Sequence, residues 1–127
     1  NYAGAPLPTP LQHAAIATWR DEAHVEENRA LYQEKFQLAD DILGNTPGYI
    51  SPEAGFFLWL RVPDGEAATL TLWKEAGVKV LPGAYLSRDP QDGSANPGAG
   101  FIRAALVAPA EDVARGLGAI RDVLGRM

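Results

Sequence analysis

The alternation of apolar and polar residues is most regular between Val25 and Leu43, where it predicts a long helix. At 100° per residue, the apolar positions form one narrow stripe and a second stripe beside it. Two stripes indicate two covered surfaces, one facing a sheet of the same domain and the other facing a partner or another domain. The alternative is a single broad core face crossed by the stem of Lys35. The first stripe contains Val25, Tyr32, Phe36, Ala39 and Leu43, and the second contains Leu31, Leu38 and Ile42.

Three more helices are predicted from periodicity and capping residues. Pro8 and Pro10 suit the start of a helix over residues 9–19, and Asp21 is a suitable N-cap after the break that follows. Asp64 and Gly77 are suitable caps for a helix over residues 66–76. A final helix opens at Pro109 with an i, i+4, i+7, i+11 stripe made by Val113, Leu117, Ile120 and Leu124.

Three apolar segments predict strands. Residues 56–62 are rich in β-branched and aromatic side chains, and both faces are apolar apart from Arg61, so we expect this strand to be covered on both sides. Residues 78–81 alternate as a short half-buried strand, and residues 101–107 form another. The element order predicts an α+β fold, in which a small, mostly antiparallel sheet packs against helices and follows a long helical segment.

Length and composition predict one domain of ordinary size. Of the 127 residues, 46% are apolar and 21% charged, which is typical of a folded globular protein. The net charge of −5 argues against a nucleic-acid partner. The longest apolar run, residues 56–60, is too short for a membrane span. No signal-peptide pattern opens the chain, so a cytoplasmic location is expected, and the start at Asn1 without Met predicts a piece of a longer protein.

Most motifs that carry chemistry are missing from the sequence. There is no cysteine, which excludes disulfides, cysteine–zinc sites and thiol catalysis. His13 and His24 lack carboxylates at ligand spacing, so both are expected to face solvent and no metal site is predicted. The adjacent pairs 26–27 and 40–41 are acidic but point in different directions on a helix, which disfavours a catalytic dyad. The Gly98-x-Gly100 sequence lacks the third glycine of a dinucleotide-binding loop.

Arg103 has the most specific chemistry in the sequence. It lies in the middle of the predicted strand 101–107 among apolar residues, and a buried guanidinium requires an anion. Two interpretations stay open: an internal salt bridge or solvated strand end, and a guanidinium that binds a ligand carboxylate through two parallel N–H···O bonds. The irregular segment 82–100 precedes this strand, and its Pro82-Gly83 corner is either a plain turn or a support that holds backbone near a ligand.

Several stretches together resemble the C-terminal part of class I/II aminotransferases, which are pyridoxal-phosphate enzymes of fold type I. Residues 55–60 are similar to the family's first small-domain strand with its Gly-x-Phe sequence, and residues 1–12 and 19–29 to its domain-connecting helices. The resemblance covers essentially the whole chain and is nearest to succinyldiaminopimelate aminotransferases. Its other two stretches are Val80-Leu81-Pro82-Gly83-Ala84-Tyr85 and Asn96-Pro97-Gly98-Ala99-Gly100-Phe101-Ile102-Arg103-Ala104-Ala105-Leu106-Val107.

This resemblance implies that Arg103 binds the α-carboxylate of an amino-acid substrate whose amino group passes to a 2-oxo acid through pyridoxal phosphate. Lys35, Lys74 and Lys79 lie outside the Ser-x-x-Lys context in which the family presents its Schiff-base lysine. No catalytic, cofactor-binding or metal-binding residue is therefore expected, and no cofactor is expected on this chain. The resemblance implies a single small domain over residues 1–127 with a linking helix at 1–45, and a missing large cofactor domain.

Two other interpretations remain open at the level of the sequence. The chain is alternatively a stand-alone regulatory module that binds a carboxylate or amino acid through Arg103 without catalysis, or an inert fragment that self-associates. Loss of a large domain would expose apolar surface, so a homo-oligomer, dimeric or larger, is expected. In each case neither a nucleic acid nor a membrane is expected as a partner.

Overall fold

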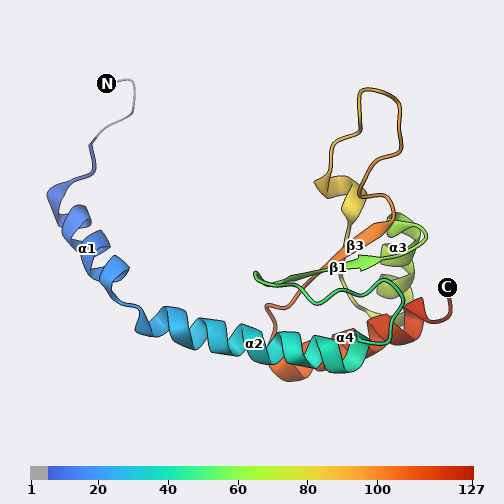
Figure 1. Cartoon of the computed structure of the whole chain (residues 1–127), viewed down its shortest axis with the longest axis horizontal. Helices are drawn as coiled ribbons and strands as arrows, with labels where there is room; N and C mark the ends of the chain where they lie inside the picture. Colours follow the sequence, from blue (N-terminus) through green and yellow to red (C-terminus); the bar gives the residue numbers. More distant parts are fainter. Residues whose placement is uncertain (1–5) are drawn as a thin grey trace. The chain divides into compact units, whose positions relative to one another are not determined.

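A computed structural model describes residues 6–127, and the chain divides into two compact units, Asn1–Leu31 and Tyr32–Met127. Within the first, helix α1 spans Thr9–Arg20 and begins after Pro8, as the prolines predicted (Figure 1). The predicted break follows at residues 21–22, where the Ala23 amide donates to Asp21 Oδ1 at 3.2 Å. Helix α2, Ala23–Leu43, begins there and continues into the second unit.

The second unit is the predicted α+β domain. Its sheet has the order β1-β3-β2 with both pairs antiparallel. The predicted caps of α3 are confirmed, because Asp64 accepts from two amides of the first turn and Gly77 takes the left-handed conformation with φ 64°. After α2 the elements are β1 (Phe57–Arg61), α3 (Gly65–Ala76), β2 (Leu81–Pro82), the 3₁₀ helix η1 (Gly83–Leu86), β3 (Phe101–Ala105) and α4 (Ala110–Leu124).

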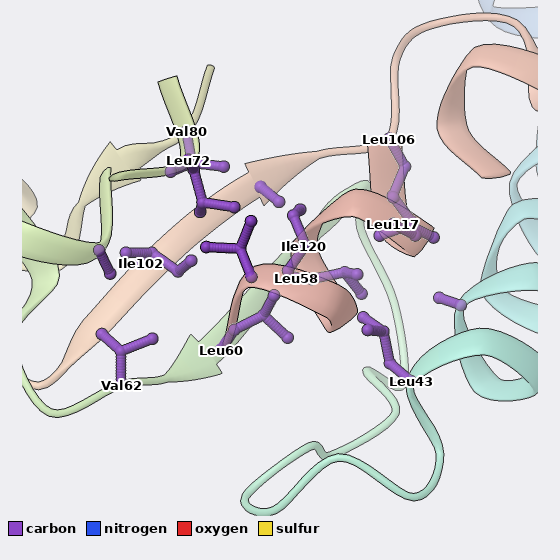
Figure 2. Packing of buried hydrophobic residues seen from close by; sticks show 14 of the residues in the cluster. Leu43, Leu58, Leu60, Val62, Leu72, Val80, Ile102, Leu106, Leu117 and Ile120 are labelled. Atoms are coloured by element: carbon purple, nitrogen blue, oxygen red, sulfur yellow. The ribbon is translucent and has the colours of Figure 1, made fainter. Parts of the chain in front are cut away.

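One hydrophobic core joins the sheet to the helices of this unit. Leu58 and Ile102 from the sheet point toward Leu117 and Ile120 of α4 (Figure 2). The α4 stripe is confirmed except at its end, where Val123 is buried and Leu124 only partly so. The other buried members are Ala39, Leu43, Leu60, Val62, Ala68, Leu72, Val80, Ala104, Leu106 and Val113.

Over Tyr32–Leu43 the structure favours the single broad core face. Ala39 and Leu43 are buried, and Tyr32, Phe36 and Ile42 pack against the same core. The Lys35 stem reaches across this face, and its Nζ donates to the Leu106 carbonyl at 2.9 Å. Leu31 lies outside this unit and is 56% exposed.

Three details of the predicted sheet are wrong. Within the second unit, strand β1 is covered on one side only, because Leu58 and Leu60 are buried while Trp59 is 45% exposed. Alternate residues of a strand point to opposite faces, and α2, α3 and α4 join the core on the face of Leu58 and Leu60. The strand expected at 78–81 pairs only at Leu81–Pro82, and residues 78–80 instead line a cavity of about 140 Å³ together with residues of β3 and α4. The segment 82–100, predicted to be irregular, contains the last residue of β2 at Pro82 and then the 3₁₀ helix η1.

None of the helices in the described part of the chain has both the length and the apolar content of a membrane span.

Candidate functional site

Arg103 lies at the centre of the sheet, on the face opposite the one that α2, α3 and α4 cover. It lies on β3, the middle strand, with Trp59 of β1 opposite on one side and Leu81 of β2 opposite on the other. Its neighbours Ile102 and Ala104 are buried, so strand alternation turns Arg103 to the open face, where it is half-buried.

The guanidinium of Arg103 rests on an aromatic ring rather than on an acid. Its Cζ lies 4.1 Å from the centroid of the Phe57 ring. Within residues 6–127, neither the ion pairs nor the side-chain hydrogen bonds of the structure involve Arg103; the four ion pairs belong to His24, Arg115, Arg121 and Arg126. The internal salt bridge left open by the sequence is therefore not formed among these residues.

An open apolar hollow lies beside this arginine on the same face. Its volume is about 360 Å³, and its walls are Trp59, Phe101, Pro97, Gly98 and Ser87. Trp59 is the residue opposite Arg103, and its ring meets that of Phe101 edge-on with centroids 6.1 Å apart. Phe101 lies two residues before Arg103 on β3, about 7 Å along the strand and on the same face.

The segment between β2 and β3 is fixed by a close approach of two glycines. A Cβ on Gly83 would lie 2.5 Å from the Gly98 carbonyl oxygen and 2.9 Å from Cζ3 of Trp59. Both glycines are buried, and Gly83 follows the Pro82 corner identified in the sequence. The corner is therefore more than a plain turn, because only residues without a Cβ allow these two backbones to touch.

Asn96 ties the rest of that segment together. Its Oδ1 accepts from the Gly98 amide at 2.8 Å and lies 2.8 Å from Ser87 Oγ, while its Nδ2 donates to Asp89 Oδ1 at 2.7 Å. Sequence reasoning did not single out Asn96, although an Asn two residues before a glycine is a common turn signal.

Tyr85 connects η1 to helix α3. Its hydroxyl donates a hydrogen bond to Glu66 Oε1 at the start of α3. That hydrogen bond and the negative charge of Glu66 raise the pKa of Tyr85 above its ordinary value. The contact tethers η1 to the helix that follows β1, although Tyr85 itself is largely exposed.

The other side chains considered in the sequence do not join this site. His13 and His24 are exposed on α1 and α2, as predicted. Asp40 accepts the Tyr49 hydroxyl at 2.7 Å, and Asp41 accepts the Gln37 amide at 2.9 Å, so this acidic pair has structural contacts. Burial and the hydrogen bond to Asp40 raise the pKa of Tyr49 well above its ordinary value. Among the described residues no three His, Asp or Glu side chains gather as a metal site would require.

Known proteins similar to this chain are aminotransferases. No protein-family model matches the chain. It is 32% identical over 115 residues to 4-dedimethylamino-4-oxo-anhydrotetracycline transaminase from Streptomyces rimosus, an alignment that covers 90% of this chain and 30% of that protein. An aminotransferase from Neisseria meningitidis Z2491 has a TM-score of 0.87 and 42% identity over 97% of this chain and 31% of its own.

The expected likeness to succinyldiaminopimelate aminotransferases is also found. A probable N-succinyldiaminopimelate aminotransferase from Thermus thermophilus has a TM-score of 0.67 and 28% identity, over 83% of this chain and 27% of its own. The Neisseria protein is more similar to the chain by both measures. The chain thus spans less than a third of the length of each of these proteins.

Proposed function

This chain corresponds to the C-terminal small-domain region of the fold type I pyridoxal-phosphate aminotransferases, and from that premise we propose that it binds the substrate carboxylate in such an enzyme. The reaction of the parent protein, meaning the longer protein that we propose contains this chain, is the transfer of an amino group between an amino acid and a 2-oxo acid. Arg103 is the residue proposed to hold the α-carboxylate shared by both substrates.

The observation that carries this proposal is the state of the Arg103 guanidinium. It is half-buried at the centre of the sheet, and none of the described acidic side chains occupies its N–H groups. A guanidinium carries five N–H donors in one plane, a geometry that matches the two oxygens of a carboxylate. The strand at the middle of the sheet fixes the backbone from which Arg103 extends, which is the first requirement for a substrate-orienting group.

The lysines of the chain do not fit the cofactor. Pyridoxal phosphate, when bound through a lysine, acts as the electron sink of the reaction. Here Lys35 Nζ donates to the Leu106 carbonyl, Lys79 Nζ lies 5.4 Å from the Trp73 ring, and Lys74 is exposed on α3. None of them offers a free amine in a site that excludes water. We therefore assign the cofactor to a large domain elsewhere in the parent protein, with residues 1–45 as its link to the small domain.

The test is steady-state kinetics of the parent protein, expressed from its complete reading frame. Arg103→Lys keeps the charge but removes the planar pair of donors, so KM for both the amino acid and the 2-oxo acid should rise about tenfold or more. Arg61→Lys is the matched control, because Arg61 also faces an aromatic ring, that of Phe101 at 5.1 Å, but lies at the strand end. Its KM values should stay within about twofold of wild type.

Equal KM values in Arg103→Lys and wild type would refute the role of Arg103. A parent protein that binds amino acids but transfers no amino group would favour the regulatory module instead. For the isolated chain, pyridoxal phosphate should give no Schiff-base absorbance that survives desalting; a stable absorbance would contradict the assignment of the cofactor to a large domain.

A further inference from the structure

The contact between Phe57 and Arg103 follows from the register of the sheet. Trp59 is directly opposite Arg103, and Phe57 lies two residues earlier on β1, on the same face and diagonal to the arginine. Long side chains reach across this diagonal, and the Arg103 Cζ lies 4.1 Å from the Phe57 ring centroid. That distance is well inside the range of about 6 Å over which a cation is attracted to an aromatic face.

An aromatic partner leaves the N–H groups of Arg103 available to a ligand, whereas an acidic partner would occupy them. A carboxylate would occupy N–H groups in the plane of the guanidinium, and these are the groups a substrate needs. The Phe57 ring instead has Arg103 Cζ over it at 4.1 Å, and an aromatic ring attracts a cation without requiring a hydrogen bond from its N–H groups. Phe57 thus stabilises Arg103 without competing for the ligand.

The Phe57 ring is itself supported by neighbouring aromatic rings. The Phe56 ring lies 4.1 Å from it, centroid to centroid, and the Tyr32 ring of α2 lies 5.9 Å from that of Phe56. Tyr32 packs against the hydrophobic core, and Lys35 Nζ lies 5.0 Å from the Tyr32 ring. These ring contacts restrict the orientations open to Phe57, the ring on which Arg103 rests.

We propose that Phe57 is a positioning residue, which holds the guanidinium of Arg103 flat with its N–H edge turned to the substrate carboxylate. This inference rests on the proposed function, because it names the residue that prepares Arg103 for that ligand. It predicts that the aromatic ring, and not merely apolar bulk, is required at position 57.

The first test is the NMR spectrum of this chain. Ring current from Phe57 should move the side-chain proton resonances of Arg103 upfield, and Phe57→Leu should return them to ordinary positions while Phe57→Tyr should retain the shift. Trp73→Leu is the matched control, because it removes an aromatic ring, 54% exposed and next to Lys79, from a different element. Phe57→Ile, whose branched side chain suits a strand, replaces Phe57→Leu if that variant does not fold. Arg103 resonances that do not respond to loss of the ring would overturn the inference.

The second test is the kinetics of the parent protein with the same variants. Phe57→Leu should raise KM for the amino acid and the 2-oxo acid about three- to tenfold and leave kcat within about twofold of wild type. A less well positioned Arg103 lowers the affinity for the substrate carboxylate but not the rate of the chemical step. Phe57→Tyr should restore wild-type KM. If Arg103→Lys raises KM but Phe57→Leu does not, this inference fails and the proposed function stands. If Arg103→Lys has no effect either, the proposed function fails.

Discussion

Gly83→Ala tests the backbone approach that shapes the site. The added Cβ would lie 2.5 Å from the Gly98 carbonyl oxygen, 2.9 Å from Trp59 Cζ3 and 3.0 Å from the Phe101 Cβ. Real Cβ atoms essentially never come closer than 3.0 Å to other heavy atoms, so the two backbone segments must separate by at least about 0.5 Å. Gly83 does not have a positive φ, so the cost is steric and not conformational.

Overpacking of this kind costs about 1–3 kcal/mol, and we take the upper end because backbone and two aromatic residues are met at once. For a chain of this size, about 3 kcal/mol lowers Tm by roughly 12 °C. Gly116→Ala is the control, since a Cβ there would meet nothing within 4 Å and the residue lies inside α4. It should raise stability by about 0.5–1 kcal/mol. Thermal unfolding followed by circular dichroism measures both, and a Gly83→Ala Tm equal to wild type would refute the close approach.

Two further predictions concern stability. Asp64→Ala removes the acceptor of the Glu66 and Ala67 amides and should lower the free energy of unfolding by about 1 kcal/mol in urea titrations, whereas Asp64→Asn should retain most of it; equal losses would contradict the cap. The raised pKa of Tyr49 means that the folded state holds its phenolic proton more tightly than the unfolded state. The stabilisation from its bond to Asp40 is thus present below pH about 10 and is lost as pH rises above it. Between pH 8 and 11, wild type should lose more unfolding free energy than Tyr49→Phe, and parallel curves would contradict this.

The helices were predictable because their signals are local. Asp64 and Gly77 cap α3 through contacts within a few residues, and Pro8 fixes where α1 begins. The position of Arg103 on a strand also followed from its apolar neighbours. Each of these features depends on residues that are close in sequence.

The open face of the sheet was not predictable in the same way. Trp59 is as apolar as its buried neighbours Leu58 and Leu60. The strand therefore has no alternation of apolar and polar residues from which the covered face could be predicted. The contact of Phe57 with Arg103 depends on the register of β1 with β3, which joins residues more than forty positions apart. The meeting of Gly83 with Gly98 likewise exists only once the loop has closed.

The most direct test of the account is a structure of the parent protein with a bound amino acid or 2-oxo acid. We expect both carboxylate oxygens to accept hydrogen bonds from the Arg103 guanidinium at about 2.8 Å, with its face still resting on the Phe57 ring. A substrate carboxylate held by another residue, with Arg103 more than about 4 Å away or paired with an acid of the parent protein, would contradict the central claim.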